Sequence, residues 1–503
     1  MWLEGNGLES PFSVRRRGSF VLSTLDFTII GVYVVVSIIS GIAMRGRQEG
    51  SDDYFTAHGQ LAGPFQSILI GLSITATFFS GVSFLALPGL AFREGWGFLC
   101  VIPGLVVCLW IARSWFLPTY LSFRNIGPYD FIETQLGKQV RLLAAVLFIL
   151  LRFSWLAVLI YAPMILLRET FDLEGASFYF VLAAIGLVCT VYTVFGGIRG
   201  VIVTSALQML LVFASMFAVV CAILWRLPVS LPETVSLLQA EGALRLPGFS
   251  LDPEKVITIW TLTIGMGINY AAMFFADQMS LQRYLVDETP QSAARSFTLN
   301  IAGTIVVLIL LFAIGLLLKA WFLAVPDANM PVDSDRVLPY FVVNYLPPGL
   351  PGLLVAGILA ATMDSITSGI NTLAAVITLD FRARFGKPMD AQAGLRFSRW
   401  TSAVVGIFAT GAALMVGQLG SLFDVGQRVL GVVMGPIFGI VLLAMFAIRV
   451  PTVAVFVATF AGCAGGIACI LVGFASVWTG CVSMGIFLLL ALAANLASAK
   501  KLA

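Results

Sequence analysis

The chain has 503 residues, of which 59% are hydrophobic and only 11% charged, and its mean hydropathy is +0.98. Soluble domains are nearer half apolar and a quarter charged, so a soluble enzyme and a disordered chain are excluded. The net charge of +3, from 29 basic and 26 acidic residues, is too even for a nucleic-acid-binding surface. The composition indicates an all-α integral membrane protein with many spans.

Thirteen apolar stretches of about 20 residues predict about thirteen transmembrane helices. They cover residues 25–44, 65–91, 96–117, 142–167, 176–195, 201–225, 256–276, 297–322, 350–379, 400–418, 427–448, 452–472 and 476–497. Lysines and arginines are more frequent on the loops that are cytoplasmic if the N-terminus is outside, and the loop 380–399 is the most basic. The run Arg15–Arg17 argues the other way. We expect a multi-pass protein of the cell membrane with its N-terminus outside and its C-terminus in the cytoplasm.

Two of these spans combine glycines with polar side chains in a way that is unusual for a membrane helix. The first contains Gly71, Ser73, Thr75, Thr77, Ser80, Gly81 and Ser83. The second contains Thr261, Thr263, Gly265, Gly267, Asn269 and Tyr270. Such sequences allow a helix to unwind, and the freed carbonyls then need an ion or a polar solute as partner. For a single such helix, close packing through small residues would be the simpler explanation.

The positions of these two spans in the chain favour unwinding. Span 65–91 opens a run of five spans, and span 256–276 opens a second run of five. Interrupted helices at corresponding places in two halves are typical of transporters with inverted repeats. The predicted division is a tail (1–24), a leading helix (25–44), a first repeat (61–225), a second, inverted repeat (256–448) and two C-terminal helices (452–497).

The span 350–379 contains one charged residue, Asp364, near its middle. A carboxylate at this depth costs at least about 2.5 kcal/mol unless it is paired or hydrated. With Ser365, Thr367 and Ser368 it forms an oxygen-rich patch, and hard cations such as sodium prefer oxygen ligands, so an ion site is the leading interpretation. Two alternatives stay open: an ion pair with Arg152, which also lies within a span, or a protonated Asp364 that couples transport to protons.

Short motifs recur in order between about residues 25 and 450. They are Asp53-Tyr54-Phe55, Gly71-Leu72-Ser73, the stretch from Thr77 to Leu85, Pro88-Gly89, Gly196-Gly197-Ile198-Arg199 with Thr204 and Gln208, Gln282-Arg283-Tyr284, the stretch from Leu338 to Phe341, and the stretch from Pro347 to Leu353 with Ala356 and Asn371. This pattern resembles the sodium:solute symporters, which include sodium-coupled carriers of sugars, proline, pantothenate, sialate, monocarboxylates and iodide. The resemblance implies two inverted five-helix repeats of the leucine-transporter class, and sodium-driven uptake of a small solute by alternating access.

The resemblance also implies a sodium site. The family's common site uses carbonyls of the first broken helix together with a carbonyl and hydroxyls of the eighth core helix. Matched by position, the carbonyls are those of Ala76, Phe79 and Ala361, and the side chains are those of Asp364 and Ser365.

The chain departs from the family at two positions. Members usually have Ser or Thr at both hydroxyl positions, whereas this chain has Asp364 before Ser365. Many members have an Asp after the Thr of a Thr-Asp motif in the fifth helix, whereas this chain has Ser205 after Thr204. We hypothesise that the carboxylate has moved across the ion site with the charge balance preserved. The departure also leaves open that ion coupling is altered or lost.

The solute site is expected between the two broken helices, near the middle of the bilayer. The predicted contacts are Ser80, Val82, Ser83, Trp155, Asn269, Tyr270, Met273, Phe274 and Gln427. For each aromatic residue among them, ordinary helix packing is the competing explanation. The segment 269–275 is largely apolar, which fits a small organic acid or another modestly polar solute better than a hexose.

The sequence therefore predicts a secondary active symporter whose partners are sodium, a small organic solute and the lipid bilayer. A proton-coupled or ion-uncoupled carrier of the same fold stays possible, as does a solute sensor that acts through a partner protein. An enzyme is not expected, because the chain has one histidine and no acidic cluster within its spans. No organic cofactor is expected.

Overall fold

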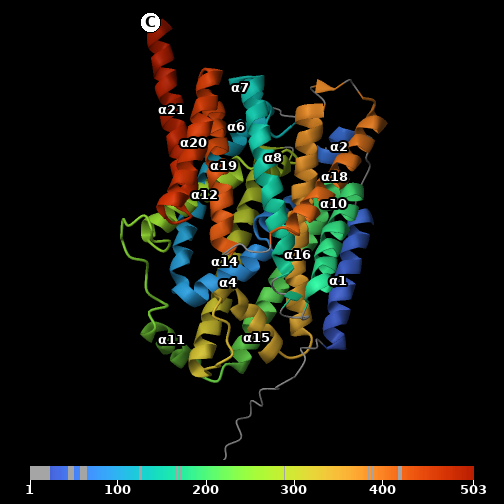
Figure 1. Cartoon of the computed structure of the whole chain (residues 1–503), viewed down its shortest axis with the longest axis vertical. Helices are drawn as coiled ribbons and strands as arrows, with labels where there is room; N and C mark the ends of the chain where they lie inside the picture. Colours follow the sequence, from blue (N-terminus) through green and yellow to red (C-terminus); the bar gives the residue numbers. More distant parts are fainter. Residues whose placement is uncertain are drawn as a thin grey trace, which may run out of the picture.

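The computed structural model describes residues 23–43, 50–56, 65–123, 127–164, 167–168, 173–287, 289–382, 385–386, 389–416 and 422–502. The predicted tail 1–24 lies almost wholly outside these residues. Helices account for nearly all of the described chain, and they run largely along one common direction (Figure 1). The expected all-α architecture is confirmed.

The helices follow the apolar stretches of the sequence. The longer ones are α1 (Thr24–Ala43), α3 (Gln66–Phe78), α4 (Gly81–Glu94), α5 (Ile102–Ile111), α8 (Lys138–Tyr161), α10 (Gly175–Arg226), α12 (Met266–Phe275), α14 (Pro290–Ala324), α16 (Leu350–Ala375), α18 (Ala391–Ala413), α19 (Leu422–Met445), α20 (Thr452–Val472) and α21 (Trp478–Leu502). The shorter elements are α2 (Ser51–Thr56), η1 (Gly95–Val101), η2 (Ala112–Phe116), α6 (Leu117–Ser122), α7 (Asp130–Leu136), α11 (Leu231–Ala240), η3 (Thr261–Gly265), α13 (Gln278–Tyr284), η4 (Ser334–Arg336), α15 (Val337–Tyr345) and η5 (Val376–Arg382).

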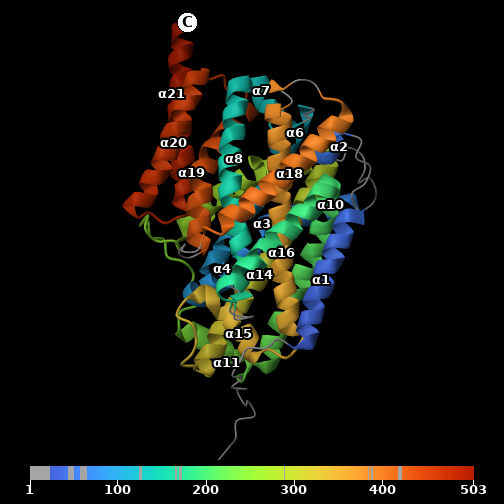
Figure 2. The same cartoon turned by 45° about the vertical axis from the view of Figure 1, so that its right-hand side comes forward.

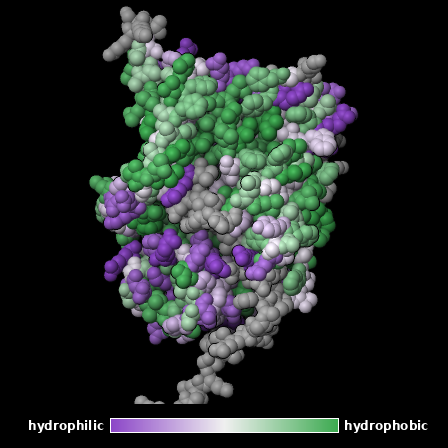
Figure 3. Space-filling view, in the orientation of Figure 1, coloured by the Kyte–Doolittle hydropathy of each residue, from purple (hydrophilic) through white to green (hydrophobic). Residues whose placement is uncertain are grey.

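Within the described residues, eight helical stretches are long and apolar enough to cross a membrane, and three shorter apolar helices accompany them. The count of thirteen spans stays a prediction. Figure 3 shows hydrophobic side chains over much of the visible surface, whereas hydrophilic ones gather at the top rim and at the lower end around α11. This distribution is the one expected for a protein that crosses a bilayer.

The leading helix α1 lies at one edge of the bundle, and α20 and α21 lie at the opposite edge in both views (Figures 1 and 2). The Asp26 carboxylate near the start of α1 accepts hydrogen bonds from the backbone N–H groups of Gly349 (2.8 Å) and Gly352 (2.7 Å) at the start of α16. The starts of these two helices therefore lie on one face, with α11 and α15. The C-terminus lies at the opposite face.

Loop residues fix the starts of several helices. Ser230 and Glu233 form a capping box at the start of α11, and the Thr289 hydroxyl caps α14 immediately before Pro290. Asp390 caps α18. Each of these side chains satisfies backbone N–H groups that the first helical turn leaves without partners.

The first broken helix is confirmed. Its halves, α3 and α4, are separated by Phe79 and Ser80, which have extended backbone conformations. Gly81 begins α4 against α16, where an added Cβ atom would lie only 2.1 Å from Oγ1 of Thr362. The break leaves the last carbonyls of α3 without partners in their own helix.

The second broken helix is also present, but its break was expected at the wrong place. The polar segment from Thr261 to Tyr270 stays helical, with a wide π-helical turn at η3. The chain instead breaks at Ala276 and Asp277, between α12 and α13. The cause is a helix cap, because the Asp277 carboxylate accepts a hydrogen bond from the N–H of Met279 (2.8 Å) and starts a new helix.

The predicted spans 176–195 and 201–225 form the two parts of α10. They meet at Gly197, whose φ of 59° and ψ of −169° interrupt the helical conformation. Positive φ is readily adopted only by glycine, which explains why the two spans are separated there.

Candidate functional site

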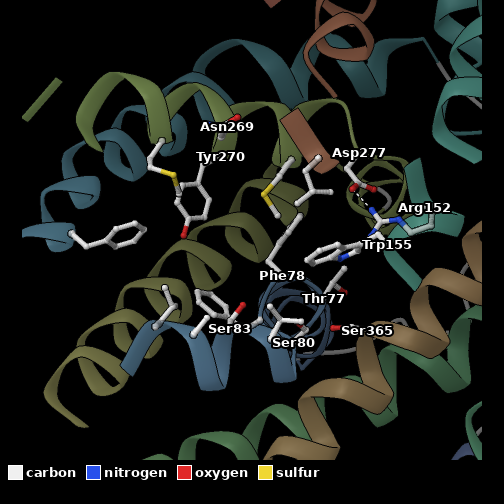
Figure 4. A pocket seen from close by; sticks show the side chains of 18 residues that line it. Thr77, Phe78, Ser80, Ser83, Arg152, Trp155, Asn269, Tyr270, Asp277 and Ser365 are labelled. Atoms are coloured by element: carbon white, nitrogen blue, oxygen red, sulfur yellow. Dashed lines mark hydrogen bonds and ion pairs between the residues drawn. The ribbon is translucent and has the colours of Figure 1, made fainter. Parts of the chain in front are cut away.

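A cavity of about 100 Å³ lies between the two broken helices, with α8, α16 and α19 at its sides (Figure 4). Its lining comprises Thr77, Phe78, Phe79, Ser80, Val82, Ser83, Ala86, Leu87, Phe98, Arg152, Trp155, Met266, Asn269, Tyr270, Met273, Asp277, Ser365 and Leu430. The cavity adjoins the break at Phe79–Ser80 and the break at Ala276–Asp277, where backbone groups are released from helical hydrogen bonding.

Most of the solute contacts that the sequence predicts are brought together at this cavity. Those that line it are Ser80, Val82, Ser83, Trp155, Asn269, Tyr270 and Met273. Phe274 does not line it: its ring is fully buried and packs against Phe78 (5.1 Å between ring centroids) and Phe297 (5.2 Å). This packing supports the competing explanation for Phe274, whose role as a solute contact stays a prediction. Gln427 lies on α19, but its side chain is outside the described residues.

Two of these residues differ in how freely they could contact a solute. The Asn269 amide nitrogen donates to the carbonyls of Gly265 (3.0 Å) and Val477 (2.8 Å), so this group holds α12 against the start of α21. Tyr270 stacks on Phe274 at 5.8 Å, and Figure 4 shows its side chain among the residues that line the cavity. Asn269 therefore positions α12, and Tyr270 is the better placed to touch a solute.

An ion pair that the sequence did not predict joins Arg152 on α8 to Asp277 at the second break (Figure 4). The alternative that Arg152 forms an ion pair with Asp364 is therefore wrong. Both side chains line the cavity although they are only 5% and 3% exposed. The sequence did contain a signal for Asp277, which ends an apolar run and precedes the polar residues of α13.

The Arg152 guanidinium has N–H groups that do not take part in the ion pair with Asp277. Asp277 accepts from one terminal nitrogen of Arg152, and Nε of Arg152 has no hydrogen-bond partner among the described residues. The guanidinium lies over the ring of Phe148, 5.5 Å from its centroid, which fixes its plane. A planar guanidinium with free N–H groups can bind a carboxylate through two parallel hydrogen bonds.

Asp364 is fully buried in the middle of α16. One carboxylate oxygen accepts a hydrogen bond from the hydroxyl of Ser205 on α10, and the other has no partner within the described part of the chain. The two positions at which this chain departs from the family pattern are therefore in direct contact. A buried charge with an unpaired oxygen is costly unless another positive group or ion compensates it.

Arg283 on α13 supplies a buried positive charge on the same side of α16. Its guanidinium donates to the hydroxyls of Ser73 (2.9 Å) and Ser368 (2.7 Å), and Ser368 lies one helical turn beyond Asp364. Arg283 also donates to the carbonyl of Met279 at 2.9 Å. It therefore connects α13, α3 and α16 at the level of the breaks.

The predicted sodium ligands lie around the first break, on two faces of α16. Ser365 and Phe79 line the cavity, and the Ser365 hydroxyl donates to the carbonyl of Ala361 (3.0 Å). Ala76 is buried at the end of α3. The Asp364 side chain points instead to α10. Carbonyl and hydroxyl oxygens at the end of a broken helix have the chemistry that a sodium ion requires.

No group of three or more His, Cys, Asp and Glu side chains that could hold a metal ion occurs among the described residues. The polar side chains that line the cavity are hydroxyls, the Asn269 amide, the Trp155 indole and the Arg152–Asp277 pair.

Comparison with known proteins places this geometry in a family. The chain is 27% identical over 431 residues to a sodium/sialic acid symporter of Aliivibrio fischeri, which covers 85% of this chain and 84% of that protein. It is 28% identical over 477 residues to the human sodium-coupled monocarboxylate transporter 1, covering 92% of this chain and 74% of that protein. These relatives are transporters and not enzymes.

A solved structure supports the fold. A sodium-coupled sialic acid symporter in a substrate-bound, outward-open state superposes with a TM-score of 0.84 at 22% identity, covering 94% of this chain and 98% of that one. The resemblance inferred from the motifs is confirmed, as are the multi-pass membrane character and the two inverted repeats, whereas the repeat boundaries stay a prediction. Because the family model matches residues 54–462, the chain belongs to the sodium:solute symporter family.

Proposed function

We propose that this symporter couples sodium entry to the uptake of a small organic anion, whose carboxylate binds at Arg152. The observation that carries the proposal is the buried Arg152 guanidinium at the cavity, with Nε free of any hydrogen-bond partner among the described residues. The names of three relatives support an anion: they transport sialic acid, monocarboxylates or iodide. The mostly apolar cavity wall agrees with a small organic acid.

The charge balance of the site gives a physical reason for coupling. Arg152 and Asp277 compensate each other, so an anion that enters alone adds one uncompensated negative charge beside buried side chains. A sodium ion bound at the adjacent first break would restore neutrality. Each ligand then raises the affinity of the site for the other by the same factor.

For the ion we propose the carbonyls of Ala76, Phe79 and Ala361 and the hydroxyl of Ser365 as ligands. Asp364 adds a negative charge near the ion, and Arg283 on the same side of α16 balances it, so the ion and the anion still neutralise each other. Ser365 and Phe79 face one cavity, which supports this assignment, and the unpaired oxygen of Asp364 lies on the neighbouring face of α16. Binding of the ion would hold α3 against α16 and so shape the cavity for the solute.

We further propose that the chain lies in the cell membrane with its N-terminus outside and its C-terminus in the cytoplasm. The basic loop 380–399 supports this orientation.

The test is uptake by purified protein in liposomes under a sodium gradient, with a potassium gradient of equal size as control. Pyruvate and N-acetylneuraminate serve as anions, and glucose and proline serve as solutes without net charge. We expect sodium-dependent accumulation of an anion. Loss of hydrogen bonds to a charged group predicts a drop of roughly 10- to 100-fold in transport efficiency for Arg152→Gln, and a smaller drop for Arg152→Lys. Arg93→Gln, at an exposed position, is the matched control.

The other outcomes discriminate among the alternatives. Accumulation of glucose or proline that Arg152→Gln leaves unchanged would contradict the anion assignment. Uptake driven by a pH gradient without sodium would identify a proton-coupled carrier, and uptake that needs no ion gradient would identify an uncoupled one. Solute binding without any uptake would favour a sensor.

A further inference from the structure

A second cavity, of about 400 Å³, lies between α1, α10 and α16. It shares no lining residue with the solute cavity. Nothing in the transport mechanism proposed above makes use of it.

The mouth of this cavity opens on the lipid-facing surface. Val32 and Val36 on α1 are 57% and 53% exposed, and Leu207 on α10 is 49% exposed. In a bilayer these side chains contact acyl chains, so a membrane-dissolved molecule can enter from the side.

The inner end of the cavity is polar. The Gln208 amide nitrogen donates to the Tyr33 hydroxyl (3.0 Å), and that hydroxyl donates to the sulfur of Met363 (3.5 Å). The amide oxygen Oε1 of Gln208 has no partner among the described residues, although Gln208 is only 4% exposed and lines the cavity. Buried amide oxygens are nearly always hydrogen-bonded, so this one indicates a missing donor.

The surroundings define the chemistry of that donor. An ionised carboxylate or phosphodiester group carries no hydrogen to donate. Any anion would also approach the side of α16 where Asp364 follows Met363. A cationic head would lose its hydration in an apolar channel. An uncharged hydroxyl can donate to Gln208, while an unbranched chain fills the apolar part that leads to the bilayer.

We propose that this cavity binds an uncharged single-chain amphiphile, of the long-chain alcohol or monoacylglycerol class, whose hydroxyl donates to Oε1 of Gln208. The bound molecule contacts Thr204 and Gln208 on α10 and Ala356 on α16. It therefore lies between α1, α10 and α16, away from the residues that line the solute cavity.

The test uses a dodecanol that carries a diazirine in its chain, photolysed with the purified full chain in nanodiscs, with mass spectrometry of the labelled peptides. We expect saturable labelling on α1 and α10 that excess dodecanol displaces. Val36→Trp fills the mouth and should reduce labelling by about tenfold, because a well-packed cavity excludes further chains. Val35→Trp, at an equally exposed position (54%) outside the cavity, should leave it unchanged.

A second variant tests the head group. In the wild type, dodecanol should compete with the probe about threefold to tenfold better than its methyl ether, the value expected for one hydrogen bond. Gln208→Leu should abolish this difference while labelling persists.

Labelling spread evenly over all lipid-facing helices and unaffected by Val36→Trp would mean ordinary boundary lipid and would overturn the site. An unchanged alcohol preference in Gln208→Leu would overturn the head-group assignment. No solute or ion is needed, so the result is independent of the transport proposal.

Discussion

The Ser205 hydroxyl on α10 donates a hydrogen bond to the Asp364 carboxylate on α16. The two positions at which this sequence departs from its family thus meet in space. This contact supports the hypothesis that the negative charge changed helices while staying beside the ion site. We therefore expect substitutions at Ser205 and Asp364 to change the sodium dependence of transport.

Exchanging the two side chains tests this hypothesis. Asp364→Asn should raise the sodium concentration for half-maximal uptake by about tenfold or more, because it removes a charge that compensates the ion. The double variant Ser205→Asp with Asp364→Ser should restore sodium activation to within about threefold of the wild type, because pairs in contact behave non-additively. Normal sodium dependence in Asp364→Asn would contradict the hypothesis. If the double variant does not regain sodium activation, the negative charge is required on α16 itself and cannot be replaced by one on α10.

The buried Arg283 should matter mainly for stability. Its guanidinium connects Ser73 and Ser368, and removing it would leave Asp364 without its nearby positive charge. Arg283→Met should therefore lower the free energy of unfolding by about 1–3 kcal/mol, because buried hydrogen-bonding groups lose their partner. Thermal unfolding in detergent measures this, with the exposed Arg93→Met as control. Equal melting temperatures for the two variants would show that the network contributes little.

Close packing at the first break predicts a difference between two glycines. Gly81→Ala places a Cβ atom 2.1 Å from Oγ1 of Thr362, whereas a Cβ at Gly31 in α1 meets nothing within 4 Å. Overpacking of this kind costs about 1–3 kcal/mol and should push α4 away from α16. We expect Gly81→Ala to reduce uptake strongly and Gly31→Ala to leave it near the wild-type rate. Similar uptake by both would contradict the geometry of the break.

A carboxylate in the turn before α14 predicts a pH effect on stability. Burial raises the pKa of Asp287 from 3.8 to about 6, although Ser292 donates a hydrogen bond to it. Between these values the folded protein binds more protons than the unfolded chain, so stability falls as the pH rises through this window. Above about pH 6 the full cost of the buried charge is present.

Asp287→Asn removes that cost. The variant should be more stable than the wild type at pH 7.5 by roughly 1–3 kcal/mol, and this advantage should shrink towards pH 4. Thermal unfolding at the two pH values measures the difference, and Asp252→Asn at a partly exposed loop position is the control. An advantage of the same size at both pH values would rule out the titration of Asp287 as its origin.

The sequence predicts the helical architecture well, because apolar stretches of the length of a bilayer leave few other structures possible. The first break was found because glycines and hydroxyls cluster around Phe79 and Ser80. The second break was predicted at the wrong position, because it depends on the helix cap at Asp277. In the sequence, a capping residue after an apolar run looks the same as the end of a transmembrane span.

Pairings across the fold were the part that the sequence could not supply. Arg152 and Asp277 are 125 residues apart, and nothing in the local sequence of either shows that α8 and the second break adjoin. The sequence also could not show that Phe274 lies outside the cavity lining, because the face of α12 that meets the cavity is set by packing against Phe78 and Phe297. By contrast, Ser205 and Asp364 were linked in advance because each departs from the same family pattern.

Direct measurement of sodium binding tests the central claim, that an ion binds between the end of α3 and α16. Radioactive sodium binding to the purified protein should be saturable, and Ser365→Ala should weaken it by at least about tenfold. Ser215→Ala is the matched control, since this buried serine on α10 also donates to a carbonyl of its own helix. Saturable binding lost in Ser365→Ala and kept in Ser215→Ala is the predicted result. Equal binding by Ser365→Ala and the wild type, or no saturable binding at all, would contradict the account.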